Sequence, residues 1–362
     1  MMSDLRYSIA LTMLPEIGPI GARKLLSVFG TPEKIFNSEV DALIAVDGIG
    51  INRAKNIKEF SSWNEIENKI KSLEKNCIKA VGFDESLYPE LLRETGDAPV
   101  VLYIKGDIHP QDRYSIAIVG SRKPTHYGTS VAENISEELA SMGFTIVSGM
   151  ARGIDALSHK GALRAGCRTL AVLGSGLDVP YPPENKGLMD KISNSGCVIS
   201  EFPPGTPPDK ENFPRRNRLI SGLSLGTLVI EATSDSGSLI TAKYALEQGR
   251  EVFAVPGNIT SPTSEGTNEL IKKGAILTRK AEDIVRELAP VLKGFIRSRD
   301  KPKIEVTEEE GRLCNLLSGE PKQIDIISRE SNLPTSKVLG ILLGLELKGA
   351  VKQTTGKRFY LA

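Results

Sequence analysis

The sequence of 362 residues is 40% apolar and 25% charged, which is typical of a globular protein with two or three domains. Its 46 Lys and Arg residues and 45 Asp and Glu residues leave a net charge of +1. That balance excludes attraction of the whole surface to a polyanion but allows a local basic groove. Because the sequence has no membrane-length apolar run and no signal-peptide pattern at its start, we expect a cytoplasmic protein that makes no membrane contact.

The amino-terminal residues contain a near-repeat, LPEIGPIGARKL from Leu14 and VDGIGINRAKNI from Val46. Each copy has a glycine where a tight turn joins two short helices, and a small alanine that lets the second helix pack closely. The pattern resembles the helix-hairpin-helix unit, whose turn amides can touch a nucleic-acid backbone. The first copy has Glu16 where the second has Gly48, and a carboxylate there would repel phosphate. A purely helical scaffold or a protein-contact domain therefore stays open as an alternative.

From about residue 76 to residue 290, short β-rich runs alternate with helical patterns, as in SIAIVG, FTIVSG, TLAVLG and TLVIEA. This alternation predicts an α/β fold with an extended Rossmann-like, doubly wound and mostly parallel sheet. Successive runs end in glycine and polar residues. Because ligands bind at the carboxyl edge of such sheets, we expect the functional residues to gather there.

The first loop at that edge follows the strand in IAIVGSRKPTHYG and begins Gly120-Ser121-Arg122. It matches neither GxGxxG nor GxxxxGK[ST], and the glutamates some twenty residues on lie within a helical pattern, so a dinucleotide cofactor is disfavoured. Backbone amides at the start of the following helix favour an anion, and Arg122 supplies a bidentate donor. The loop is a candidate phosphate pocket.

A second loop, VSGMARGIDALSHKGAL, would place Arg152 at the same edge as Arg122. Asp155 is in a position to cap the following helix, and Arg152 could instead pair with Asp155 or with another local acid. His159 has no Ser or Cys nucleophile near it in sequence, so we interpret it as a core or surface residue rather than a catalytic one.

The stretch PPDKENFPRRNRLISGLS is the most basic segment of the chain. Basic and polar residues surround one aromatic ring, namely Lys210, Asn212, Phe213, Arg215, Arg216, Asn217 and Arg218. A ring beside cations offers a stacking surface to the bases of any single strand, worth about 1 to 3 kcal/mol per base. In the alternative interpretation, Phe213 is buried and the arginines cap helices or pair across a dimer.

A fourth stretch, GTLVIEATSDSGSLITAKYALEQGR, ends a strand and starts a helix at Ser236-Gly237-Ser238, which favours an anion. Nucleoside-monophosphate phosphoribohydrolases carry PGGxGTxxE on a similar sheet. Here the double glycine is absent, so that enzyme interpretation is disfavoured. It stays the competing hypothesis, with Glu231 or Asp235 as acid or base. A third possibility is an interaction hub whose small domains dock partners.

The charged segment at residues 291–303 has the composition of a linker. After it, three helical patterns and a final two-strand pattern with Gly356 at its turn follow the order of a winged helix. The second and third helices are separated by a helix-turn-helix spacing. The recognition-helix candidate TSKVLGILLGLELKG has few polar side chains that could contact bases, so partner binding or packing is an equal alternative to base recognition.

The scattered Cys77, Cys167, Cys197 and Cys314 form no CxxC pair and are accompanied by three histidines. Neither a disulfide framework nor a zinc site is indicated, and we expect no metal and no cofactor.

Taken in order, GSRKPT, SGMARGIDALSHKGAL, TLAVLGSGLDVPYPPEN, SEFPPGTPP, NFPRRNRLISGLS, SGSLITAKYALEQGR and VPGN resemble the DNA-processing protein A family, also called Smf. The resemblance covers nearly the whole chain and implies four parts: a helix-hairpin-helix domain at 1–75, a Rossmann-like single-stranded DNA-binding domain at 76–290, a linker at 291–303 and a winged helix at 304–362. It also implies a cytoplasmic homodimer without catalytic activity that binds incoming single-stranded DNA in natural transformation and loads RecA recombinase on it.

Applied to this sequence, the resemblance assigns the nucleic-acid contacts to the basic loops described above. Gly120, Ser121 and Arg122 would form a phosphate pocket and Arg152 a second phosphate contact, while Lys210 and Phe213 would supply charge and a stacking ring. The remaining predicted contacts are Asn212, Arg216 and Asn217.

Overall fold

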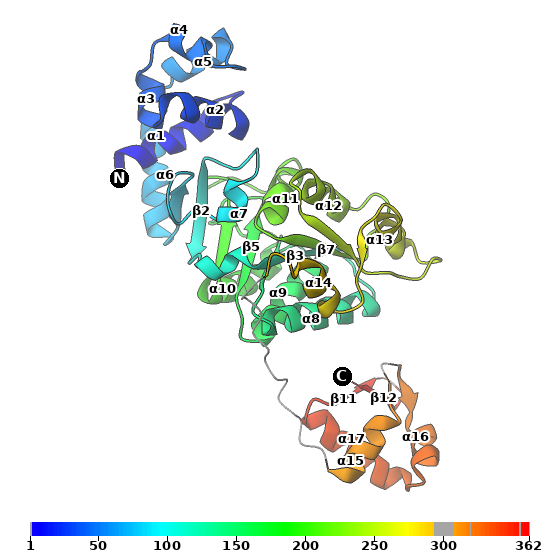
Figure 1. The fold of residues 1–362 in the computed structure, drawn as a ribbon. Coiled ribbons are helices and arrows are strands. Elements are labelled where there is room, and N and C mark those ends of the chain that lie inside the picture. Colours follow the sequence, from blue (N-terminus) through cyan, green and yellow to red (C-terminus); the bar gives the residue numbers. More distant parts are fainter. Residues whose placement is uncertain (1, 293–306, 319, 355, 362) are drawn as a thin grey trace. The chain divides into compact units, whose positions relative to one another are not determined.

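The computed structural model describes residues 2–292, 307–318, 320–354 and 356–361. It divides the chain into two compact units, residues 1–297 and residues 298–362, each of which is described by itself (Figure 1). Most of the predicted linker at 291–303 falls outside the described residues. Among the described residues, no helix combines the length and the apolar composition needed to cross a bilayer.

The first unit begins with helices that form two similar hairpins. Gly18 and Gly50 precede the second helix of each hairpin in nearly the same backbone conformation, with φ of −82° and −80°. The small side chains of Ala22 and Ala54 are buried one turn later, so the helix-hairpin-helix prediction is confirmed. The helices are α1 (Met2–Met13), α2 (Pro19–Phe29), α3 (Pro32–Asn37), α4 (Val40–Ile44), α5 (Ile51–Lys58) and α6 (Trp63–Lys75).

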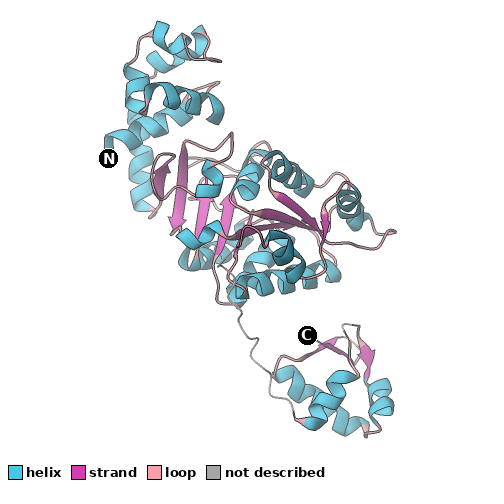
Figure 2. Cartoon of the chain, viewed as in Figure 1, coloured by secondary structure: helices cyan, strands magenta, loops and turns pink. Residues whose placement is uncertain are grey.

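A nine-stranded sheet forms the centre of this unit (Figure 2). Its strands are β1 (Lys79–Gly82), β2 (Val101–Gly106), β3 (Ser115–Gly120), β4 (Thr145–Ser148), β5 (Thr169–Leu173), β6 (Cys197–Ser200), β7 (Gly226–Ile230), β8 (Glu251–Ala254) and β9 (Ile276–Leu277). They lie in the order β1-β2-β6-β5-β4-β3-β7-β8-β9. β2 is antiparallel to both of its neighbours, and the strands from β6 to β9 in that order are parallel. The predicted fold class is confirmed.

Helices cover both faces of the sheet (Figure 1). One apolar core joins the sheet to α8, α9 and α14, and another joins it to α7, α11 and α12, which is why the parallel strands are buried almost throughout. The helical segments are α7 (Glu90–Arg93), η1 (Pro110–Arg113), α8 (His126–Ser141), α9 (Ile154–Arg164), η2 (Pro183–Asn185), α10 (Lys186–Ser195), α11 (Asn212–Gly222), α12 (Gly237–Glu247), α13 (Pro262–Lys272) and α14 (Ala281–Leu288).

The strand order reverses between β3 and β7. From β3 the chain proceeds through α8 to β4 on one side, whereas from β7 it proceeds through α12 to β8 on the other side. The carboxyl ends of β3 and β7 therefore mark the point where the topology reverses, which is the usual ligand position in open α/β sheets.

The second unit is a small winged helix with its own apolar core, confirming that prediction. Its elements are α15 (Glu308–Asn315), β10 (Lys322–Gln323), α16 (Ile324–Ser331), α17 (Thr335–Leu347), β11 (Val351–Thr354) and β12 (Arg358–Leu361). Gly356 lies in the turn between β11 and β12 with φ of +82°. In α17, Lys337 pairs with Glu309 of α15 at 2.7 Å, so this cation of the recognition-helix candidate is already engaged within the unit.

Candidate nucleic-acid interface

Backbone contacts join the loop after β3 to the end of β7 and to the loop after β4, at the carboxyl edge of the sheet. The Ser121 amide donates to the Ile230 carbonyl at 3.3 Å, and the Ile154 amide donates to the Ser121 carbonyl at 3.1 Å. A β-carbon at Gly120 would overlap with the Ile230 carbonyl oxygen, and one at Gly153, where φ is +75°, would overlap with the Ser121 carbonyl oxygen. The glycines thus allow three neighbouring segments to converge at the predicted site.

The Arg122 side chain extends from this loop and is exposed. Its guanidinium carbon lies 5.9 Å from the centre of the Phe213 ring, which comes from the start of α11. Within the described part of the chain, Arg122 forms no ion pair. The structure therefore brings together a cation and a ring that were predicted separately, and leaves the charge available to a ligand.

Arg152 is also exposed, but an acid already engages it. Its Nε pairs with Oε1 of Glu184 in η2, so the alternative of a local ion pair is correct, although the acid is Glu184 rather than Asp155. The hydrogen bond to Glu184, and after it one to Tyr181, raises the pKa of Arg152. A phosphate at Arg152 has to compete with this carboxylate.

Asp155 does not cap α9 as predicted; its carboxylate instead holds the loop before that helix. It accepts hydrogen bonds from the amides of Gly149 at 3.1 Å and Ala151 at 3.4 Å. Burial raises the pKa of Asp155, while the nearby Arg216 charge opposes that shift. By accepting from these two amides, the Asp155 carboxylate fixes the shape of the β4–α9 loop.

Arg216 lies beneath the surface, which corrects the prediction that it touches nucleic acid directly. Only 5% of the residue is exposed, and its Nη1 donates to the carbonyls of Gly149 and Val172. A β-carbon at Gly149 would collide with the guanidinium. Burial lowers the pKa of Arg216 to about 10, so the side chain stays charged at neutral pH. Arg216 supports the β4–α9 loop and places a fixed positive charge under it.

Phe213 is half-buried at the amino end of α11. A β-carbon at Gly174, just after β5, would lie 2.9 Å from its Cδ1, so the ring packs on bare backbone. The Tyr181 ring is its second neighbour, with centroids 5.5 Å apart and planes inclined by 39°. Lys210 nearby in sequence is exposed and forms no ion pair with any described residue.

The two predicted asparagine contacts differ in their environment. Asn217 donates from Nδ2 to the Gly237 carbonyl at 3.3 Å, linking α11 to the start of α12. Asn212 is the half-buried first residue of α11. Asn217 therefore has a structural bond that a ligand contact would have to share.

Glu231 and Asp235, the acid and base of the competing enzyme hypothesis, are both engaged by neighbours. Glu231 is buried, and its two carboxylate oxygens accept from the Thr125 amide at 2.8 Å and from the Thr125 hydroxyl. Asp235 is exposed, and a hydrogen bond from Thr233 lowers its pKa. A lowered pKa makes Asp235 a poor general acid at neutral pH, and the Glu231 carboxylate is already occupied by Thr125.

His159 is fully buried, which agrees with a core role. Its Nδ1 lies 2.7 Å from the Thr169 hydroxyl, and that hydroxyl donates to the Ile146 carbonyl, so Nδ1 carries the proton. Burial lowers the pKa of His159 to about 3. Over residues 2–292 and the described parts of the winged helix, no three His, Cys, Asp or Glu side chains gather as metal ligands would.

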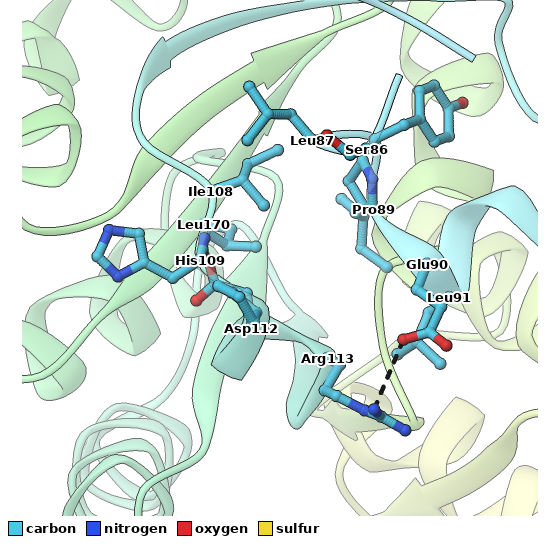
Figure 3. A pocket seen from close by; sticks show the side chains of 13 residues that line it. Ser86, Leu87, Pro89, Glu90, Leu91, Ile108, His109, Asp112, Arg113 and Leu170 are labelled. Carbon is cyan, nitrogen blue, oxygen red and sulfur yellow. Dashed lines mark hydrogen bonds and ion pairs between the residues drawn. The ribbon is translucent and has the colours of Figure 1, made fainter. Parts of the chain in front are cut away.

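A hollow of about 230 Å³ lies at the opposite, amino edge of the sheet (Figure 3). Leu170 and Leu223 contribute apolar surface, and Arg113 at its rim pairs with Glu90 at 3.7 Å. Asp112 is already held by Arg168 at 2.9 Å. With its arginine neutralised, this hollow lacks the free cations of the carboxyl edge.

Sequence reasoning did not identify Tyr181 and Glu184 as part of the site. Both lie in the proline-rich segment DVPYPPEN that follows β5. A single aromatic ring among prolines directly after a strand could have indicated them, because that loop also leaves the carboxyl edge.

Family models match the chain in the order of its folded parts. The model described as SAM-like Helix-hairpin-helix tandem matches residues 8–61, and the DprA winged helix domain matches residues 297–357. Between them, DNA recombination-mediator protein A matches residues 79–289, which is more than half of the chain and includes all the converging loops. The chain belongs to the DNA recombination-mediator protein A family. The resemblance recognised from the sequence motifs is confirmed.

Relatives in this family cover most of the chain. Protein Smf of Escherichia coli is 38% identical over 330 residues, covering 88% of this chain and 87% of that protein. The DNA processing protein DprA of Bacillus subtilis is 40% identical over 259 residues, covering 71% and 86%.

Solved structures of the family share the fold. The X-ray structure of DNA processing protein A from Streptococcus pneumoniae superposes with a TM-score of 0.69 at 33% identity, covering 78% of this chain and 97% of that one. DNA processing protein A from Helicobacter pylori, described for its single-stranded DNA binding mode, gives a TM-score of 0.54 at 30% identity, covering 59% and 96%.

Proposed function

We propose that this chain binds single-stranded DNA along the carboxyl edge of its sheet and performs no chemistry on it. The observation that carries the proposal is the exposed Arg122 guanidinium, unpaired among the described residues and 5.9 Å from the Phe213 ring. A cation fixes a phosphate, and an adjacent ring stacks on a base of any sequence. A duplex keeps its bases stacked inside and cannot use the ring, so the pair favours single strands.

The other predicted contacts extend this site in a consistent way. Gly120 and Ser121 shape the phosphate loop, Lys210 adds a free cation, and Asn212 begins the helix that carries Phe213. Arg152 joins the site when it exchanges Glu184 for a phosphate. The cations and the ring address phosphates and base faces, which every base sequence offers, so we expect binding that is independent of sequence.

We also propose that the protein acts as a homodimer that loads RecA recombinase on the bound strand during natural transformation. Membership in the DNA recombination-mediator protein A family supports this role. The test is RecA assembly on single strands precoated with single-stranded DNA-binding protein, with and without this chain, together with the molar mass of the free protein in solution. Unchanged RecA assembly would contradict the loading role, and a monomeric mass would contradict the dimer.

The binding proposal is tested by titrating fluorescent oligothymidylate and a duplex of equal length at several salt concentrations. Two to three phosphate contacts predict a slope of log K against log salt of about −1.4 to −2.1 for the single strand. A protein that retains neither strand at low salt, or prefers the duplex, would disprove the proposal.

The absence of chemistry is tested separately by incubation with nucleoside monophosphates and chromatography for released base. We expect no turnover above the rate without protein. Sustained release that Glu231→Gln abolishes would establish the phosphoribohydrolase alternative instead.

A further inference from the structure

The segment between β5 and α10 borders the proposed site, and hydrogen bonds hold it in place. The Asn185 amide donates to the Met150 carbonyl at 2.9 Å, in the loop that carries Arg152. The Ser175 hydroxyl donates to the Val179 carbonyl at 2.8 Å, which closes the first part of the segment. These bonds hold Tyr181 in a defined place beside the loop after β4.

Tyr181 presents an aromatic ring to solvent at this place. The residue is 37% exposed, and its ring centroid lies 5.5 Å from that of Phe213. The Arg152 guanidinium lies close to the Tyr181 hydroxyl, which contributes to the raised pKa of Arg152 after the larger effect of Glu184. A tyrosine that only covered the Phe213 ring would not need both an exposed surface and a contact with a candidate phosphate ligand.

The geometry of the two rings decides how bases could use them. A base needs about 3.5 Å on each of its faces, so a gap of 5.5 Å between centroids is too narrow for one base between the rings. The inclination of 39° shows that the two rings are in contact without stacking in parallel on one another. Neighbouring bases of an extended strand can each stack on one ring.

We infer that Tyr181 is a second stacking ring of the site, which takes the base next to the one on Phe213. The ligand class is a single strand with at least two unpaired consecutive bases. Arg122 lies beside Phe213 and Arg152 beside Tyr181, so each ring has a cation for the adjoining phosphate. This inference rests on the proposed function and adds to it a residue and a minimum ligand.

The test measures oligothymidylate affinity and its salt dependence for Tyr181→Ala, Tyr181→Leu and Tyr181→Phe. Loss of one stacked base predicts binding weaker by about 5- to 150-fold for the Ala and Leu variants, with an unchanged salt slope. Leu keeps apolar packing against Phe213 but lacks a flat ring. Tyr181→Phe should bind like the wild type, because it keeps the ring. If Tyr181→Leu also binds like the wild type, stacking on Tyr181 is disproved.

Tyr114→Ala is the matched control, because Tyr114 also has a guanidinium over its ring, that of Arg113 at 5.3 Å, but lies at the amino edge. A direct reporter is Tyr181→Trp, whose emission should be quenched by oligothymidylate relative to that of wild-type Trp63. Unquenched emission of Tyr181→Trp would overturn this inference alone. The same holds if Tyr181→Ala and Tyr114→Ala affect binding equally while Phe213→Ala weakens it. If the wild type retains no single strand, the proposed function fails instead.

Discussion

The guanidinium carbon of Arg122 lies 5.9 Å from the centre of the Phe213 ring, although Arg122 lies in the loop after β3 and Phe213 lies at the start of α11. The strand order brings them together, because β5, β4 and β3 are consecutive neighbours and Phe213 packs on Gly174 just after β5. Charge and stacking surface are thus supplied by separate residues, and substitution should affect them separately.

Arg122→Ala should weaken oligothymidylate binding to a similar extent for every base sequence. One lost phosphate contact predicts a salt slope shallower by about 0.7 logarithmic units. The measurement is a titration at four or more salt concentrations. Arg113→Ala, which removes an arginine beside a tyrosine ring at the amino edge, is the control and should leave the slope unchanged. Equal slopes for the two variants would remove Arg122 from the phosphate pocket.

Phe213→Ala should weaken binding without altering the salt slope, because the ring carries no charge. Loss of one stacked base corresponds to about 1 to 3 kcal/mol of binding free energy. The affinity is measured by fluorescence anisotropy, and Phe213→Tyr should retain most of it. A slope change equal to one phosphate contact in the Ala variant would argue against stacking.

Glu184→Gln should tighten single-strand binding by about two- to fivefold, because it releases Arg152 from an exposed ion pair. The salt slope should steepen by about 0.7 as Arg152 takes a phosphate. Glu137→Gln serves as control, since Glu137 pairs with Arg164 on the outer helices at 3.1 Å. Unchanged affinity in Glu184→Gln would show that Arg152 is not a phosphate ligand.

His159 should make the stability of the first unit sensitive to acid. Its pKa is about 3 when folded against an ordinary value of 6.5, so between these pH values the unfolded chain binds one more proton. The contribution of His159 to the free energy of unfolding therefore falls by about 1.4 kcal/mol for each pH unit below 6.5.

His159→Gln removes this titration and can keep a hydrogen bond to Thr169. Urea denaturation followed by circular dichroism, from pH 7 to pH 4.5, should show a smaller loss of stability on acidification in the variant than in the wild type. Parallel pH profiles for the two proteins would mean that another group carries the acid sensitivity.

Much of the fold could be predicted from sequence because buried parallel strands are continuous apolar runs. The runs that became β2 to β8 were visible in this way. β1, with only Val81 buried, and the two-residue β9 lack such a run and were missed. The reversed direction of β2 leaves no trace in composition, because strand polarity depends on the connection rather than on the residues.

The site was predictable only as far as charge and ring character identify it. Arg122 was predicted because loops after strands meet at one edge, and Phe213 because it is a ring among basic residues. Arg215 and Arg216 are adjacent in sequence, yet the helix turns one toward solvent and the other under Gly149, and sequence alone does not fix which. The pairing of Arg152 with Glu184 depends on how the segment after β5 folds back, which no local pattern encodes.

The burial of Arg216 has a consequence for any count of cations made from a salt titration. The slope of such a titration reports the number of counterions that the strand and the protein surface release on binding. Arg216 is buried and donates to two backbone carbonyls, so it exchanges no counterions when a strand binds. Dissolved salt screens a buried charge only weakly. Its attraction for a bound strand, reduced by the neighbouring Asp155 carboxyl, should therefore persist at high salt as a residual affinity that the slope does not record.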